Sequence, residues 1–178
     1  MEMVEVKVSS KWARHLFACS PDFIREQCHG RCCEGVKDLK ISLTPEEAVR
    51  ETAKGNMVIN GLLRGDPATG KCPYKNSPNG FCFLHGKAHK FLNCVADPFT
   101  LVGRTLIVRY RYAMLTCGGQ GEPAYKVFRP SLDRIFGNGE AARLVSALDA
   151  GLYNPHAEMP QETFDALHAI NDIKRGTL

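Results

Sequence analysis

The sequence lacks long apolar runs, and its first ten residues lack the positively charged region of a secretory signal peptide. Its longest apolar runs span only a few residues, far fewer than a membrane-crossing helix needs. Internal repeats and low-complexity segments are also absent. From these absences we expect a cytoplasmic protein that is not a repeat protein and has no membrane partner.

Cysteine, in contrast, is abundant. The 178 residues, 44% of them hydrophobic, suffice for one domain with one core, and eight of them are cysteines. In a reducing compartment so many cysteines favour metal or redox chemistry over structural disulfides. The formal net charge of +4 assumes neutral thiols, so it is a poor argument for a nucleic-acid partner.

Two stretches of the chain, residues 17–33 and 71–99, contain all the cysteines except Cys117. The first stretch contains Cys19, Cys28, Cys32 and Cys33, and the second contains Cys72, Cys82 and Cys94. A thiolate site needs several sulfurs within about 2.3 Å of one metal, and a close-spaced group combined with a distant one supplies them. We predict a metal site whose ligands are drawn from Cys28, Cys32, Cys33, Cys72, Cys82 and Cys94.

The spacing favours an iron–sulfur cluster over zinc. Structural zinc prefers C-x2-C knuckles, of which the sequence has none, and the adjacent Cys32 and Cys33 would crowd one tetrahedral ion. An iron–sulfur cluster accommodates ligands at less regular spacing. Zinc stays the alternative. Phe81 and Phe83 flank Cys82 and are predicted to shield the site from water.

Local patterns predict an α+β fold, a small irregular single domain with short strands and helices around a cysteine-ligated metal centre and a helical C-terminal tail. Strands are expected at 3–8, 38–43, 81–84 and 104–112, and helices at 44–54, 86–93 and in the tail. The best signal is at Thr44, which caps a helix that starts at Pro45, with Glu47 completing a capping box. We divide the chain into a metal-binding domain, 1–135, and a helical extension packed on the same domain, 136–178.

Several of these motifs together resemble a known family. They are Cys28-His-Gly-Arg-Cys-Cys33, Leu43-Thr-Pro-Glu-Glu47, Cys72-Pro-Tyr74, Gly80-Phe-Cys-Phe-Leu-His85 and Cys94 ahead of Phe99. Their order and distances resemble the YkgJ-type cysteine-cluster family of zinc or iron chelators, over roughly residues 17 to 117. The resemblance implies metal binding. One branch of the family resembles flagellin lysine methylases, in which a cluster accompanies methyl transfer from S-adenosylmethionine, but this sequence shows no separate methyl-donor motif.

Three other patterns are set aside. Residues 65–71 fit the phosphate-loop pattern G-x4-G-K, but Cys72 stands where magnesium binding needs Ser or Thr, and Pro73 prevents a following helix. One group of residues has the composition of a nucleic-acid surface: Arg104, Arg109, Arg111, Arg129 and Arg134 with Tyr110 and Tyr112. A solvated strand face is the favoured interpretation, because alternation alone predicts it, so nucleic acid is disfavoured. His29 beside Cys28 suits a catalytic thiol, but a metal fits the many nearby cysteines better.

Three functional hypotheses stay open. The first is a small metal-binding protein with an iron–sulfur cluster or zinc. The second is a cluster-dependent enzyme acting on a protein side chain, such as a protein lysine methyltransferase. The third is an interaction module in which zinc only staples the fold. Whether the protein is an enzyme is left open, and a protein substrate or partner fits the second and third hypotheses.

Overall fold

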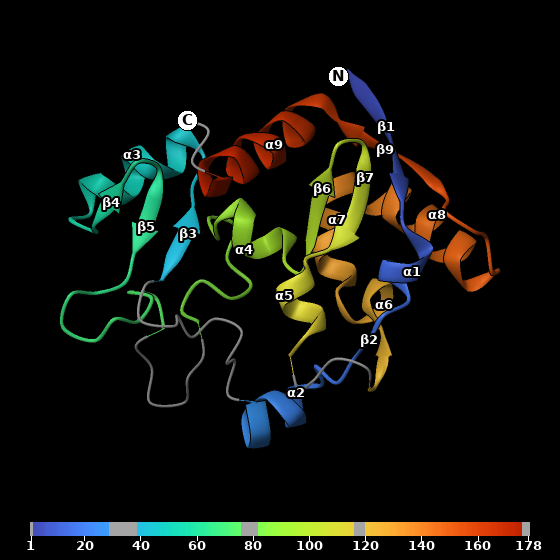
Figure 1. Cartoon of the computed structure of the whole chain (residues 1–178), viewed down its shortest axis with the longest axis horizontal. Helices are drawn as coiled ribbons and strands as arrows, with labels where there is room; N and C mark the ends of the chain where they lie inside the picture. Colours follow the sequence, from blue (N-terminus) through green and yellow to red (C-terminus); the bar gives the residue numbers. More distant parts are fainter. Residues whose placement is uncertain (1, 29–38, 76–81, 116–119, 176–178) are drawn as a thin grey trace. The chain divides into compact units, whose positions relative to one another are not determined.

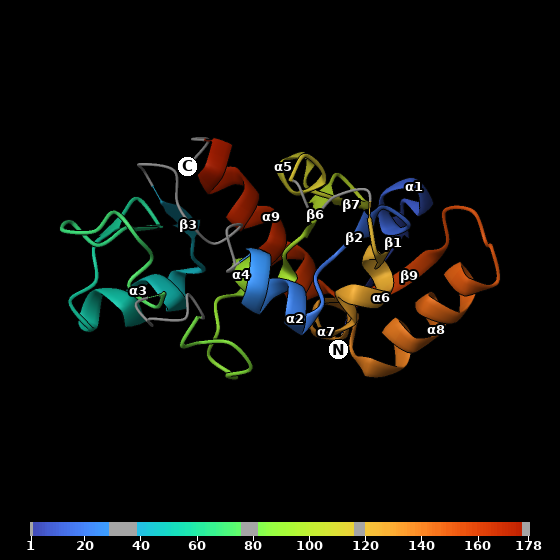
Figure 2. The same ribbon diagram turned by 90° about the horizontal axis from the view of Figure 1, so that it is seen from below.

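The computed structural model describes residues 2–28, 39–75, 82–115 and 120–175, which form both helices and strands, the predicted α+β mixture (Figures 1 and 2). The chain separates into two compact units, Met1–Ser20 with Val95–His168 and Pro21–Cys94 with Ala169–Leu178. The predicted boundary near residue 135 separates a metal-binding domain from a helical extension. A division of the chain by compactness does not test that boundary, so it stays a prediction. Within the described ranges, no helix is long and apolar enough to cross a membrane.

A four-stranded sheet in the order β6-β7-β1-β9 forms the first unit. Its strands are β1 (Met3–Val8), β6 (Phe99–Val102), β7 (Thr105–Val108) and β9 (His156–Pro160). β1 runs parallel to β7 and antiparallel to β9. Figures 1 and 2 show β1 and β9 side by side, although they come from opposite ends of the chain. The strand predicted at 3–8 is confirmed, and its alternation buries Val4, Val6 and Val8 on one face.

Helices pack on this sheet. α7 (Arg129–Phe136) and α8 (Asn138–Asp149) lie against each other and against β9. Their apolar faces are buried through Leu132, Ile135, Leu144 and Leu148. The shorter elements of the unit are α1 (Ser10–Ala13), β2 (Leu16–Phe17), which pairs with β8 (Glu122–Pro123), α5 (Tyr110–Ala113) and α6 (Ala124–Val127).

Two predictions in this part of the chain need correction. The strand expected over 104–112 ends at Val108, and the arginine and tyrosine residues that follow belong to α5. The tail contains α8 and α9 (Gln161–Arg175), as predicted, but β9 lies between them. β9 is a strand because all five of its residues pair with β1, a long-range contact that its own sequence does not signal.

The second unit contains a three-stranded sheet in the order β3-β5-β4. The unit comprises α2 (Pro21–Phe23), a π-helix (Ile24–Cys28), β3 (Lys40–Ser42), α3 (Pro45–Ala53), β4 (Val58–Ile59), β5 (Leu62–Arg64) and the first three residues of α4 (Leu92–Ala96). The helical turns before Cys28 were not predicted, because Cys, Gly and Pro nearby favoured irregular structure. The strand at 38–43 is confirmed in its central residues.

α3 forms as its sequence predicts. The Thr44 hydroxyl accepts from the Glu47 N–H at 3.3 Å, and the Glu47 carboxylate accepts from the Thr44 N–H at 2.9 Å. Pro45 is the first helical residue, and Gly55 follows the C-cap with a φ of 80°. The next predictions are less accurate. The helix expected at 86–93 begins only at Leu92, so that it contains Cys94, and the described residues of 81–84 form a turn.

Candidate functional site

Half of the predicted ligand pool gathers on one small core in the second unit. The core consists of Ile41, Leu43, Leu63, Cys72, Leu84 and Phe91. Cys72 is buried within it, and the half-buried Cys82 and Cys94 pack against it. Cys28 is the last residue of the π-helix, while Cys32 and Cys33 lie outside the described residues.

The described side chains alone do not form a metal centre. Among them, no three His, Cys, Asp or Glu groups lie close enough together to hold one ion. The predicted site also requires residues outside the described ranges, so it stays a prediction. His85 and His89 are both exposed to solvent. Of the two phenylalanines predicted to shield the site, Phe81 lies outside the described residues and Phe83 is 59% exposed, while the neighbouring Leu84 packs in the core.

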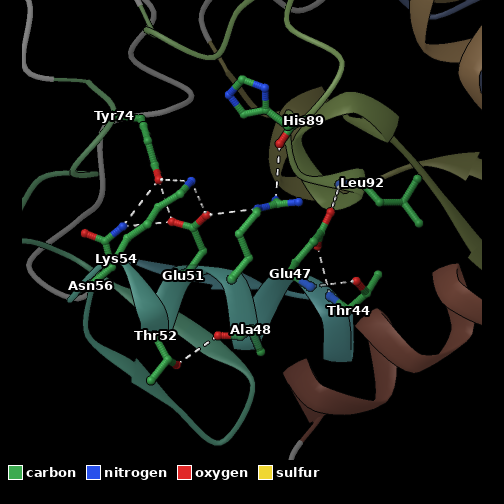
Figure 3. A network of polar contacts seen from close by, with 11 residues as sticks. Thr44, Glu47, Ala48, Glu51, Thr52, Lys54, Asn56, Tyr74, His89 and Leu92 are labelled. Atoms are coloured by element: carbon green, nitrogen blue, oxygen red, sulfur yellow. Dashed lines mark hydrogen bonds and ion pairs between the residues drawn. The ribbon is translucent and has the colours of Figure 1, made fainter.

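Helix α3 binds the chain segment that leads to Cys94 (Figure 3). While one Glu47 oxygen accepts the capping bond from Thr44, the other accepts the Leu92 N–H at 2.8 Å. Leu92 is the first residue of α4 and lies two positions before Cys94. Arg50 adds a second link, because its guanidinium donates to the His89 carbonyl at 3.3 Å. The same helix therefore holds both the approach to α4 and its first turn.

One turn further along α3, Glu51 binds the segment that follows Cys72 (Figure 3). Its carboxylate is fully buried and accepts the Tyr74 hydroxyl at 2.6 Å. Asn56 donates to the same oxygen at 2.8 Å, and Lys54 donates to the other oxygen at 3.0 Å. The Tyr74 ring packs edge-on against Phe91, with 5.6 Å between ring centroids. Both the polar and the apolar parts of Tyr74 are thus fixed.

The protonation states in this cluster support one another. Burial raises the pKa of Glu51, but the hydrogen bonds from Tyr74, Lys54 and Asn56 outweigh burial and hold that pKa below its ordinary value. Burial and the bond to Glu51 raise the pKa of Tyr74. The bonds to Tyr74 and Glu51 raise the pKa of Lys54. At neutral pH the cluster therefore holds an ionised carboxylate, a protonated phenol and an ammonium group.

Backbone turns extend this anchoring to the third cysteine. The Tyr74 carbonyl accepts the N–H of Phe83, the residue directly after Cys82, at 2.8 Å. The carbonyls of Cys72 and Cys82 accept N–H groups three residues ahead, at 2.9 and 3.0 Å, so each cysteine begins a tight turn. All three described cysteines of the second group therefore lie within two residues of a bond to α3 or to Tyr74.

The structure shows the contacts made by two of the sequence patterns that were set aside, the 65–71 loop and the arginines and tyrosines over 104–112. In the 65–71 loop, the N–H groups of Ala68 and Thr69 donate to the Asp66 side chain and that of Gly70 to the Asp66 carbonyl, so these amides do not cradle a phosphate. In the 104–112 run, Arg109 pairs with Asp97 at 3.1 Å and the buried Tyr112 donates to the same carboxylate. A solvated strand face was thus also a wrong interpretation there.

The sequence interpretation missed Glu51 and Tyr74 as a pair. Glu47 and Glu51 are four residues apart, which places them on one face of the predicted helix, and that spacing is a signal that the sequence contains. Tyr74, however, comes from a segment more than twenty residues away from Glu51, and a helix pattern does not identify such a partner.

Comparisons of the chain with protein-family models, with curated proteins and with solved structures find no match. The resemblance to the YkgJ-type family therefore rests on the motifs themselves.

Proposed function

We propose that the protein binds a metal through cysteine thiolates, with ligands drawn from Cys28, Cys32, Cys33, Cys72, Cys82 and Cys94. The observation that supports this proposal is the gathering of Cys72, Cys82 and Cys94 on one small core. These residues come from two turns and a short helix that are separated along the chain.

A buried cysteine by itself behaves as a small apolar side chain, so burial is a weak argument for a metal. The convergence on one core of three cysteines, two of them from an irregular segment, is a stronger argument for a metal. Between Arg64 at the end of β5 and Leu92 at the start of α4, the described residues form neither helix nor strand. Long loops seldom persist in a compact unit without their own structure, and a small core is commonly supplemented by a metal cross-link. A cysteine-bound metal supplies such a cross-link.

An iron–sulfur cluster is the favoured metal group and zinc the alternative, because of the ligand spacing. When bound, a cluster would supply electron transfer and zinc a structural cross-link. The chain's own residues contribute thiolates, a surrounding apolar core and the turns that orient them. A cluster-dependent protein lysine methyltransferase and a zinc-stapled interaction module are the competing proposals, and in both the partner is a protein.

The first experiment is purification without oxygen, followed by metal quantification and visible absorbance. We expect a coloured protein with iron and sulfide bound in amounts close to a whole cluster per chain. A colourless protein with one bound zinc would exclude the cluster and favour the interaction module. Protein with neither metal, and with its cysteines paired as disulfides, would contradict the proposal.

Serine substitution then tests the ligand pool. Cys72→Ser, Cys82→Ser and Cys94→Ser should each lower the metal bound per chain, because each removes one thiolate. Cys19→Ser is the matched control, since Cys19 lies in the first unit and outside the pool. Metal content unchanged in all three variants would remove these residues from the site. Loss of folding together with the metal would indicate a structural staple, and a folded protein without metal would indicate another role.

A further inference from the structure

Two buried glutamates of α3 lie where they control the geometry of the second cysteine group. Building on the proposed function, we infer that Glu47 and Glu51 are positioning residues of the metal site, and that Tyr74 transmits the effect of Glu51. They do not bind the metal. They fix the backbone on which the thiols are carried.

The hydrogen bond between Glu47 and Leu92 constrains the position of Cys94. Glu47 is 8% exposed, and both of its carboxylate oxygens accept backbone N–H groups, one at Thr44 and one at Leu92. The first bond fixes the glutamate side chain on its own helix, and the second fixes the first turn of α4. Because Cys94 lies in that five-residue helix, its position follows that of Leu92.

The hydrogen bond between Glu51 and Tyr74 constrains the positions of both Cys72 and Cys82. Tyr74 lies two residues after Cys72, and its hydroxyl is held by Glu51 at 2.6 Å. Its carbonyl, in turn, holds the Phe83 N–H directly after Cys82. One tyrosine therefore connects the helix with both turns that carry these cysteines.

A rigid helix sets the distance between the two anchors. Residues four apart on a helix lie about 5–6 Å from each other on one face. α3 has a complete capping box at its start and a glycine after its end, so both ends are well defined. The anchors for Cys94 and for Cys72 are thus held at a fixed spacing by one element.

Stability alone is a poor explanation of these glutamates. Burying a carboxylate requires the loss of its hydration, and apolar side chains of similar volume often stabilise a core equally well or better. Glu51 is fully buried nonetheless, with four side chains donating to it, those of Arg50, Lys54, Asn56 and Tyr74. Directional bonds fix atoms more closely than apolar packing does, and a metal site requires its ligands within about 0.5 Å of the productive geometry.

Glu51→Gln, Tyr74→Phe and Glu47→Gln are the test variants. In Glu51→Gln the side-chain NH2 group faces hydrogen-bond donors, so one of the bonds that Glu51 accepts is lost. Tyr74→Phe keeps the ring against Phe91 but removes the hydroxyl that bonds to Glu51. A glutamine at position 47 leaves one of the two N–H groups without an acceptor. Glu46→Gln is the matched control, because Glu46 directly precedes Glu47 in α3 and its side chain is exposed.

The first readout is the rate at which a chelator removes the metal from folded protein, together with the absorption spectrum of the bound metal. Loss of partners that orient metal ligands commonly lowers metal affinity about 10- to 100-fold. We expect release at least about 10-fold faster and a shifted spectrum in all three test variants, with Glu46→Gln like the wild type. Variants that melt at lower temperature but keep the wild-type release rate and spectrum would overturn the positioning role.

A second readout uses reduced, metal-free full-length protein. A bifunctional thiol reagent should bridge pairs among Cys72, Cys82 and Cys94 in the wild type and in Glu46→Gln, and less efficiently in the test variants. Equal bridging in every variant would overturn the inference. This readout also separates the proposed metal site from the proposed positioning role of α3. Wild-type protein that never binds metal would refute the metal site. The bridging comparison would still decide whether α3 positions the thiols.

Discussion

Glu140, in the first turn of α8, binds two partners from different parts of the chain. Its carboxylate accepts from Nε and Nη2 of the Arg143 side chain, at 2.8 and 2.5 Å, and from the Glu158 N–H of β9 at 2.7 Å. The Glu140 side chain is only 19% exposed. The bond from Arg143 lowers the pKa of Glu140 further than burial raises it, and the Glu158 N–H adds to the lowering.

This pKa predicts how the contribution of Glu140 depends on pH. A carboxyl whose folded pKa is lowered stabilises the fold above the unfolded value of about 4.3 and ceases to do so as the pH falls through the folded pKa. Glu140→Gln should therefore lower the free energy of unfolding by about 1 kcal/mol at pH 7, and the difference should shrink below about pH 4. Chemical denaturation at several pH values measures this, with the exposed Glu162→Gln as a control for net charge. A pH-independent difference would contradict it.

At the scale of elements, the β4–β5 hairpin depends on two residues with positive φ. Asn60 and Gly61 have φ angles of 51° and 71°, and Ile59 pairs with Leu62 across them, as in a two-residue hairpin turn. Asn-Gly between apolar residues is a hairpin signal that the sequence contains. A side chain at position 61 would also meet the Ile173 side chain, 3.1 Å from the added carbon.

Comparing Gly61→Ala with Gly55→Ala separates backbone strain from crowding. Gly55 has a φ of 80° and open space where a side chain would extend, so Gly55→Ala introduces only the backbone strain. We expect a loss of about 1–2 kcal/mol for that variant and a larger loss for Gly61→Ala. Thermal or chemical denaturation measures both. Equal losses would mean that Ile173 moves aside without cost.

At the scale of the whole molecule, each compact unit has its own buried residues. Leu144 of α8 in the first unit and Leu63 of β5 in the second are both fully buried. Replacing either leucine by alanine should cost about 2–5 kcal/mol, because the surrounding core only partly fills the cavity. The two substitutions are chemically identical and differ only in the unit that they affect.

Hydrogen exchange then tests how far the units unfold independently. Leu144→Ala should speed exchange at the amides of β1 and β9, and Leu63→Ala should speed it in α3 and β5, with little effect on the other unit. Faster exchange throughout the described chain in both variants would instead show one cooperative unit.

Local sequence determined the elements whose signals are complete within a few residues. The capped start of α3, its end before Gly55 and the alternating strand β1 are of this kind, because caps and alternation act between near neighbours in the chain. The sequence also determined which cysteines group together along the chain, and hence the metal hypothesis.

Only the tertiary structure decided which distant segments meet. β9 is a strand because it pairs with β1, α5 replaces the end of a predicted strand where Tyr112 bonds to Asp97, and Tyr74 reaches Glu51 from a loop. Cys72, Cys82 and Cys94 share one core for the same reason. Such contacts depend on packing and hydrogen bonds across long loops, and these interactions leave no periodic pattern in either partner's sequence.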